Sequence, residues 1–447
     1  MRNPTRWLVA CLVVLAATRA EAFPSFARKY GMSCTACHVA WPIFNQVGQS
    51  FWDNGYQFDL GKDDSINQGL SYIPFSIRTT PNYTFTRSTN QASDNGPVAT
   101  QTGGISPPGV DILTGGTIAK DLSFLVVLTG FSPSDGQALV ESAWARVSNL
   151  GGSSWLNFKA GKFELDLPAS AHRDVSLAGV GYAVYGAHPA GSLVGFDMSE
   201  NQLGLELSGH DARSSTRYSL AVVNANGDPG SGNAWSSPLV YAHVQRSFEL
   251  DNRVLPWVRV GALGAVGWLP TSFATNGTNA DGSPASVPGT GRDHKSYQRV
   301  GGELSWMLGY PATPALFTAA FMYGREEAGL AGTDPATATD LSGQSNSFTG
   351  GFLELDWVPF AEVSYNSTPW LFFARYDFVR YATGSGDYDG GTLGVRRYLA
   401  FGPKGAMAIH AELHADKTRG AGAPDPNTNI AKDVESQSFL VGLDFDF

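Results

Sequence analysis

The sequence predicts an all-β protein, namely a transmembrane antiparallel β-barrel of about 16 strands, within a range of about 14 to 18. Three observations predict this fold class: an export signal at the start, a long region in which apolar and polar residues alternate, and a final strand that ends on an aromatic residue. After residue 22 no apolar stretch is long enough for a transmembrane helix. Any membrane crossing is therefore expected to be made by strands.

Residues 1–22 have the pattern of a signal peptide. Arg2 and Arg6 precede the apolar run Trp7–Ala17, and small residues lead up to Ala22. The run is too short for a helix to cross the hydrocarbon layer of about 30 Å, so an uncleaved anchor is the weaker interpretation. We expect three parts: the signal peptide over 1–22, an N-terminal segment over 23–60 and the barrel over 61–447.

From about residue 71 the chain alternates apolar and polar residues in runs that break at Gly, Asn, Asp or Pro, which is the period of β-strands. In "FLELDWV", for example, Leu353, Leu355 and Trp357 oppose Glu354 and Asp356. A soluble all-β fold, the alternative, would have to bury one such face beside many charges. A transmembrane barrel instead turns apolar side chains to lipid and charged ones to a wet lumen, and its closure pairs every backbone group.

The connections and the last strand complete the predicted barrel. We expect tight turns at Lys120–Asp121 and Asp251–Asn252, and loops on one side over 270–295, 330–347 and 417–435. In the final run "SFLVGLDFDF" aromatic and aliphatic residues share one face and the chain stops on Phe447. This pattern is typical of strands that the bacterial outer-membrane assembly machinery recognises, so we expect the bacterial outer membrane as the location.

One motif in the N-terminal segment carries chemistry: Cys34-Thr35-Ala36-Cys37-His38. Without the signal peptide, Cys34 and Cys37 are the only cysteines, so no disulfide framework exists. Cys-x-x-Cys-His is the attachment pattern of c-type haem, in which both thiols form thioethers and the histidine binds the iron. A zinc site would need two further ligands, and a redox dithiol a βαβ context. We therefore predict one c-type haem, with His38 as an axial ligand.

The N-terminal segment is too short to cover a haem alone, because segments below about forty residues rarely bury enough surface to fold. We expect it to form a plug in or across the barrel lumen. The aromatic side chains expected against the porphyrin are Phe26, Trp41, Phe44, Phe51 and Trp52. Simple packing between plug and barrel is the alternative explanation for each of them.

The second axial ligand is not determined by the sequence. Met32 lies close to the motif, and His410 and His414 lie on the predicted lumen face, while water or an open position are further alternatives. Arg28 and Lys29 are candidates to pair with the haem propionates, or are simply exposed.

The flanks of the motif match a known pattern. The matching residues are Pro24, Phe26, Ala27, Arg28, Gly31, Cys34, Cys37, His38, Pro42, Gly48, Phe51, Gly55 and Tyr56. This segment resembles the fused monohaem cytochrome-porin family, the outer-membrane c-type cytochromes of the iron-oxidising type. The barrel and the segment "GKFELDLPAS" at 161–170 also look like that family. Phe44 and Val47 depart from its pattern, in which Leu and Phe stand at these places.

The resemblance implies electron transfer: extracellular Fe(II) gives an electron to the haem, which passes it to a periplasmic carrier. Such a protein is an electron-transfer protein or, if counted as an enzyme, an oxidoreductase. The carboxylates Glu303, Glu354, Asp356 and Asp377 would then draw in a cation or merely line the lumen. The alternatives are a porin with a structural or sensory haem, and electron export to extracellular acceptors.

The charge of the chain excludes one class of partner. Removal of the signal peptide changes the formal net charge from −10 to about −12, and no basic patch is present. We expect no nucleic-acid partner. The expected partners are outer-membrane lipid, an extracellular electron donor such as Fe(II), and the periplasmic carrier.

Overall fold

The structure is a computed structural model. It describes residues 24–58, 63, 74–91, 97–106, 110–130, 139–177, 181–189, 192, 194–225, 238–252, 254–270, 294–310, 312–330, 343–359, 370–382, 386–402, 405–422 and 431–446. The predicted signal peptide over 1–22 and the terminal Phe447 lie outside these residues.

The described residues form a closed barrel of antiparallel strands, as the sequence predicts. β3 and β4 follow one another along the same neighbour, because both pair with β20. On their other side β3 pairs with β6 and β4 pairs with β5. The pair β3–β4 therefore fills one place in the wall, and the pair β5–β6 fills the next. The described wall therefore has sixteen places. The strands are β3 (Phe75–Thr79), β4 (Asn82–Gln91), β5 (Val98–Ser106), β6 (Val110–Ala119), β7 (Leu122–Thr129), β8 (Leu139–Val147), β9 (Asn157–Phe163), β10 (Gln202–His210), β11 (Thr216–Asn224), β12 (Pro238–Glu249), β13 (Trp257–Pro270), β14 (His294–Leu308), β15 (Ala315–Glu326), β16 (Asn346–Trp357), β17 (Trp370–Tyr381), β18 (Tyr388–Gly402), β19 (Gly405–Thr418) and β20 (Val434–Asp446).

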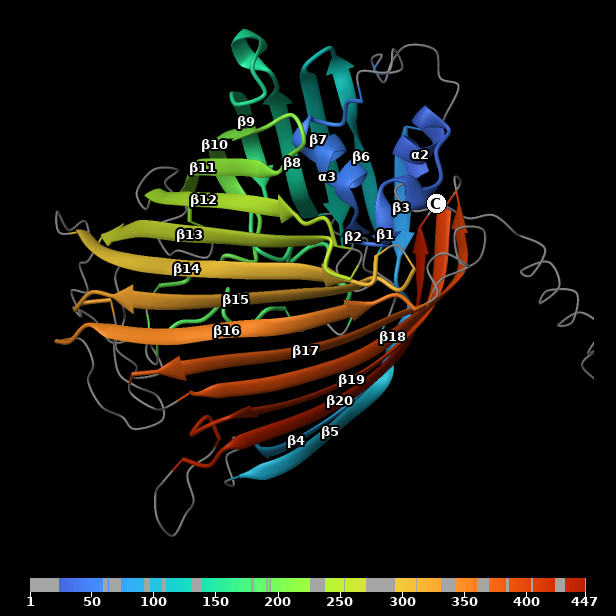
Figure 1. The fold of residues 1–447 in the computed structure, drawn as a ribbon. Coiled ribbons are helices and arrows are strands. Elements are labelled where there is room, and N and C mark those ends of the chain that lie inside the picture. Colours follow the sequence, from blue (N-terminus) through green and yellow to red (C-terminus); the bar gives the residue numbers. More distant parts are fainter. Residues whose placement is uncertain are drawn as a thin grey trace, which may run out of the picture.

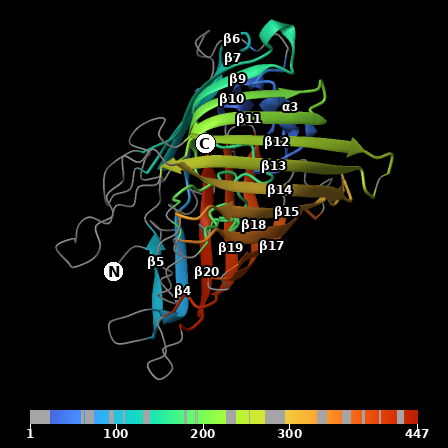
Figure 2. The same cartoon turned by 90° about the vertical axis from the view of Figure 1, so that its left-hand side faces the viewer.

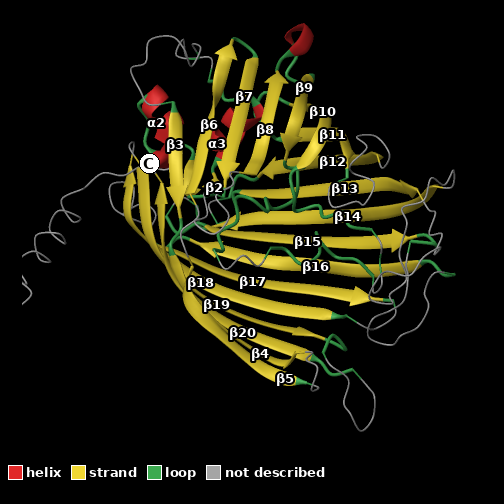
Figure 3. Cartoon of the chain, turned by 180° about the vertical axis from the view of Figure 1, so that it is seen from behind, coloured by secondary structure: helices red, strands yellow, loops and turns green. Residues whose placement is uncertain are grey.

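Neighbouring strands follow one another around the wall, as Figure 1 and Figure 2 show, and strands make up nearly all of the regular structure in Figure 3. The connections at one end are mostly short: residues 120–121 join β6 to β7, and 403–404 join β18 to β19. At the other end they are longer, for example 271–293 between β13 and β14. The predicted turn at Lys120–Asp121 is confirmed, whereas Asp251–Asn252 lie in a wider connection over 250–256. The predicted loops 270–295 and 330–347 fall mostly outside the described residues. The predicted loop 417–435 is described over 417–422 and 431–435, and its ends belong to β19 and β20.

The alternation of side chains has the predicted orientation. On β16, Leu353 is 48% exposed on the outer face, whereas Glu354 beside it is 5% exposed and points inward. The outer face is a belt of exposed apolar side chains that includes Leu203, Leu220, Val244, Val300, Phe321, Leu353, Leu393, Ile409, Leu413 and Leu443. Apolar residues outside and charged residues inside are the arrangement of a membrane-spanning barrel. None of the described helices is both long and apolar enough to cross a membrane.

The interior differs from the wet lumen that the sequence suggests, because protein fills much of it. Residues 164–201, called the lumen segment here, join β9 to β10 and cross to the opposite wall. The Tyr182 hydroxyl donates to Glu354 on β16 at 3.1 Å, and the Ser192 hydroxyl donates to Glu326 on β15 at 2.6 Å. Glu354 and Glu326 are thus buried and bonded to protein groups, which offsets the cost of burying their charges.

The N-terminal segment also packs against the inside of the wall. Its elements are α2 (Pro24–Tyr30), the 3₁₀ turn η1 (Cys34–Ala36), β1 (His38–Ala40), β2 (Ile43–Phe44) and α3 (Gln46–Asp53). Figure 1 shows α2 (blue) beside β3. The Arg146 guanidinium on β8 donates to the Trp52 carbonyl in α3 at 3.3 Å, and the Asp121 amide in the β6–β7 turn donates to the Gln57 side chain at 2.9 Å. The segment therefore lies toward the end with short connections.

Candidate functional site

The Cys-x-x-Cys-His motif is held in a compact loop. Cys34 begins η1, and the Cys37 amide donates to the Cys34 carbonyl at 3.2 Å, after which His38 opens the β1–β2 hairpin. Asn45 caps α3, because its side-chain oxygen accepts from the Gly48 amide at 3.0 Å. The Asn45 side-chain amide also donates to the Ala36 carbonyl at 3.0 Å. One side chain thus ties the helix to the motif.

The motif opens onto a cavity of about 230 Å³ between the N-terminal segment and the wall. Cys34, Cys37 and His38 all line this cavity. So do the five aromatic residues that the sequence analysis placed around a porphyrin, which are Phe26, Trp41, Phe44, Phe51 and Trp52. The barrel closes the other side with apolar residues, among them Leu125, Val127 and Phe163. The walls are therefore mainly apolar and aromatic, as a cavity for a large flat ligand requires.

His38 has an unsatisfied ring nitrogen at this cavity. Its Nδ1 atom is buried and has no hydrogen-bond partner among the described residues. Burial lowers the pKa of the His38 imidazole to about 4, an effect that the Pro42 and Ile43 carbonyls oppose only in part. The ring is therefore neutral at ordinary pH, which is the form that binds a metal.

The thiol of Cys37 is poorly suited to chemistry that needs a thiolate. Burial raises the pKa of the Cys37 thiol to about 11, so the thiolate that zinc binding or dithiol exchange needs is scarce near neutral pH. The described residues contain no group of three or more His, Cys, Asp or Glu side chains arranged to hold a metal ion. Two thiols and a neutral histidine on an apolar cavity fit a covalently bound haem.

The structure separates the candidates for a second iron ligand. Met32 lines the cavity, whereas neither His410 nor His414 does. His410 Nδ1 accepts from the Arg396 guanidinium at 3.1 Å, and His414 Nδ1 bonds to the Thr392 hydroxyl at 2.9 Å. Both histidines thus belong to buried networks that β18 and β19 share. The sequence placed them correctly on the inner face, but it could not give their height in the barrel.

The cations at the cavity are not the predicted ones. Arg28 donates to the Phe75 carbonyl at 2.7 Å and Lys29 to the Thr117 hydroxyl at 2.9 Å, so both bind the barrel wall. The cationic side chains that line the cavity are Arg78, Lys159 and Arg173. They come from β3, β9 and the lumen segment, so only closure of the barrel brings them to the motif.

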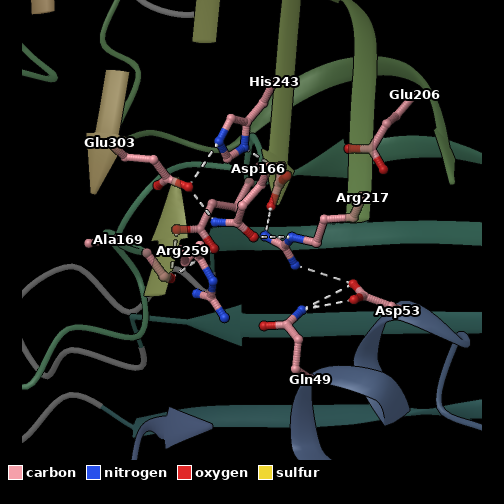
Figure 4. Close-up of polar contacts among 12 residues, drawn as sticks. Gln49, Asp53, Asp166, Ala169, Glu206, Arg217, His243, Arg259 and Glu303 are labelled. Atoms are coloured by element: carbon pink, nitrogen blue, oxygen red, sulfur yellow. Dashed lines mark hydrogen bonds and ion pairs between the residues drawn. The ribbon is translucent and has the colours of Figure 1, made fainter. Parts of the chain in front are cut away.

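A polar network connects the N-terminal segment to the wall (Figure 4). Arg217 on β11 reaches Asp53 of α3 at 3.3 Å and Asp166 of the lumen segment at 2.6 Å. His243 on β12 contacts Asp166 at 2.9 Å and Glu303 on β14 at 3.5 Å. Glu303 was a candidate for cation attraction, but here it is buried and paired within the protein.

Asp166 is central to this network. Burial alone would raise the pKa of its carboxyl, but the charges of Arg217 and His243 outweigh burial and hold that pKa below its usual range. Asp166 therefore stays ionised, and it links α3, the lumen segment and the wall through charge-assisted contacts.

Of the other candidate carboxylates, Asp377 and Glu354 contact Arg375, whereas one oxygen of Asp356 is buried and has no hydrogen-bond partner among the described residues. Arg375 donates to Asp377 at 2.8 Å and lies 3.7 Å from Glu354. Glu354 and Asp356 do line a second cavity of about 510 Å³, which borders α3 and the lumen segment. This second cavity shares Phe44 and Trp52 with the cavity at the motif.

Comparisons with known proteins give only distant similarities. No protein-family model matches the chain, and no curated protein matches it. Among solved structures, it is similar to OmpT, an outer-membrane protein of Vibrio cholerae, with 12% identity over 84% of this chain and 100% of that chain, at a TM-score of 0.48. An anion-selective porin from Comamonas acidovorans has 11% identity over 83% of this chain and 100% of that chain, at a TM-score of 0.49. OmpF of Salmonella typhi has 11% identity over 83% of this chain and 97% of that chain, at a TM-score of 0.46. The fold described above rests on the strand pairings themselves.

Proposed function

We propose that this protein carries electrons across the bacterial outer membrane through one c-type haem held inside its barrel. In the proposed direction, external Fe(II) is oxidised to Fe(III), and its single electron finally reduces a periplasmic carrier. The observation that carries the proposal is the cavity at the motif, which both cysteines, the neutral His38 and five aromatic residues line. The motif and its flanks also resemble the cytochrome-porin family.

The residues at the cavity have distinct roles in this proposal. Cys34 and Cys37 would hold the haem through thioethers, and His38 would bind the iron. Arg78 and Arg173 would hold the propionates, since each has a buried guanidinium nitrogen without a hydrogen-bond partner among the described residues. The aromatic residues would exclude water. The haem itself would supply a centre for reversible one-electron exchange.

The position of the cavity supports a periplasmic exit for the electron. Cys34 packs against Ala406 at the start of β19, next to a two-residue connection, and Gln57 bonds to the β6–β7 turn. Outer-membrane barrels place short turns on the periplasmic side and long loops outside. The motif would then lie near the periplasm, where a soluble carrier can approach.

The second cavity also lies at the end with short connections, because Leu250, Pro256 and Tyr310 of the connections 250–256 and 309–314 line it. It borders α3 and the lumen segment, and it shares side chains with the cavity at the motif. Among its lining groups are Asp53, Glu206 and Asp356. Asp53 is paired with Arg217 at 3.3 Å, and Glu206 is paired with Lys159 at 2.9 Å. This end of the barrel would therefore present charged and polar groups near the haem, on the side where a periplasmic carrier would approach.

Difference spectroscopy on intact cells tests the proposal. Cells that express the wild-type protein, with the haem oxidised at the start, receive Fe(II) from outside. We expect the absorption bands of reduced c-type haem to develop in the wild type. His38→Ala and the double variant Cys34→Ala/Cys37→Ala serve as controls and should give no such bands. A wild-type haem that stays oxidised after the addition would contradict Fe(II) oxidation.

The same experiment separates the alternatives. A porin with a structural or sensory haem would give no change on addition of Fe(II), together with a conducting pore after reconstitution into a bilayer. Electron export would instead give rapid oxidation of the reduced haem by external Fe(III) and only slow reduction by Fe(II).

A further inference from the structure

The lumen segment brings a second histidine, His172, to the cavity at the motif. His172 lines the same cavity as Cys34, Cys37 and His38, although it lies more than a hundred residues away from them in the chain. Its Nε2 atom is buried and has no hydrogen-bond partner among the described residues. A buried ring nitrogen that lacks a partner is costly, so its retention indicates a ligand.

The other ring nitrogen of His172 is fixed. Nδ1 lies 3.1 Å from a carboxylate oxygen of Glu141 on β8. A histidine that binds a metal typically donates its second ring N–H to a carboxylate or carbonyl, which sets the tautomer and the direction of the ring. The Glu141 contact leaves Nε2 as the atom that is available for coordination.

The backbone around His172 is held as well. The Glu164 carboxylate accepts from the Ala171 amide at 2.8 Å and from the His172 amide at 3.3 Å. It also accepts from the Ser170 hydroxyl at 2.7 Å. These bonds close a turn that presents His172 from the wall side of the cavity, whereas His38 comes from the N-terminal segment.

We infer that His172 is the second axial ligand of the haem, so that the iron is coordinated by two histidines. This inference rests on the proposed haem. It favours His172 over Met32, which also lines the cavity, because contacts with Glu141 and Glu164 fix both the ring and the backbone of His172. With both axial positions filled by the protein, external Fe(II) would give its electron from outside the coordination shell of the haem iron.

Spectroscopy of the full-length protein with covalently bound haem, purified in detergent, tests the assignment. We expect electron paramagnetic resonance to show a six-coordinate, low-spin iron in the ferric wild type. We expect its absorption spectrum to lack the charge-transfer band of a thioether ligand. His172→Gly should become high-spin, and free imidazole should restore the low-spin signal. Met32→Leu, the matched control, should stay low-spin.

A second variant covers the case in which His172→Gly does not fold. His172→Met keeps a ligating group, and we expect it to gain the thioether charge-transfer band. The assignment is overturned if the wild type is high-spin, if His172→Gly stays low-spin, or if His172→Met keeps the wild-type spectrum. Haem content separates the two failures: a wild type without covalent haem overturns the haem proposal as well, whereas a normal content with an unaffected spin state overturns only the role of His172.

Discussion

At the scale of single residues, the chemistry of the site depends on where buried polar atoms find partners. His38 and His172 each have a buried ring nitrogen without a hydrogen bond among the described residues, and both line one cavity. By contrast, the ring nitrogens of His410 and His414 bond to neighbours on β18 and β19. Histidines of this protein thus differ in whether neighbouring side chains satisfy both ring nitrogens.

Asp166 supports a prediction at this scale. Because its ionised form is held by Arg217 and His243, Asp166→Asn should reduce the free energy of unfolding at pH 7 by about 2 kcal/mol, with Arg217 still bound to Asp53. Unfolding by urea, followed by fluorescence, measures the loss. Asp251→Asn in an exposed turn is the matched control and should cost little.

The cost of Asp166→Asn should also depend on pH. A carboxyl whose pKa is lowered by folding stabilises the folded state above its unfolded pKa of about 3.9, and this contribution is lost as the pH falls toward the folded pKa. The difference between wild type and variant should therefore be constant between about pH 5 and pH 8, where Asp166 is ionised, and shrink below about pH 4. A difference that stays the same at low pH would contradict the role of the Asp166 charge.

At the scale of elements, α3 determines the shape of the motif. Its cap residue Asn45 bonds to the Ala36 carbonyl within the motif, and its third residue, Gly48, lies directly against the Cys37 carbonyl. A Cβ atom at Gly48 would lie 2.2 Å from the Cys37 oxygen. The close approach of helix and motif thus requires glycine at this position.

Gly48→Ala should therefore displace Cys37 and impair attachment of the haem. Relief of such an overlap costs about 1–3 kcal/mol, and here the backbone of the motif would have to move. Haem staining of denaturing gels should show loss of most of the covalent haem while the barrel still folds. Gly104→Ala on β5 is the control, because a Cβ atom there meets nothing within 4 Å. Normal haem content in Gly48→Ala would contradict this account.

At the scale of the whole molecule, a closed wall surrounds two inserted segments. The outer belt faces lipid in our interpretation, and the interior is filled by the N-terminal segment and the lumen segment, whose polar groups bond to inward charges such as Glu354 and Glu326. A haem in this position would be covered by three parts of the chain. None of these three parts would cover a haem alone.

The lipid-facing belt gives a prediction for the whole barrel. Leu413 is 57% exposed and lies opposite Leu393 on the neighbouring strand, which is 60% exposed. Leu413→Arg should destabilise the barrel in lipid vesicles by about 2–4 kcal/mol if this position lies near the bilayer centre, because the charge would have to leave water. Leu413→Met should be close to neutral. Equal stability of the arginine variant and the wild type in urea titrations would contradict a membrane position for this face.

Features that depend on local order could be predicted from the sequence. The period of two predicted the strands and their faces, correctly for Leu353 and Glu354, and the five-residue motif with its aromatic flanks predicted which side chains share one cavity. The haem, its function and the location remain predictions.

Features that depend on closure of the barrel could not be predicted from local order, because they involve segments far apart in the chain. Alternation tells which way a side chain points but not its height or its neighbours across the lumen. The structure therefore brought Arg78, Arg173 and His172 to the motif, assigned His410 and His414 to other networks, and filled the lumen that the sequence suggested was wet. The physical reason is that buried charges and ring nitrogens need partners, and here those partners come from segments far apart in the chain.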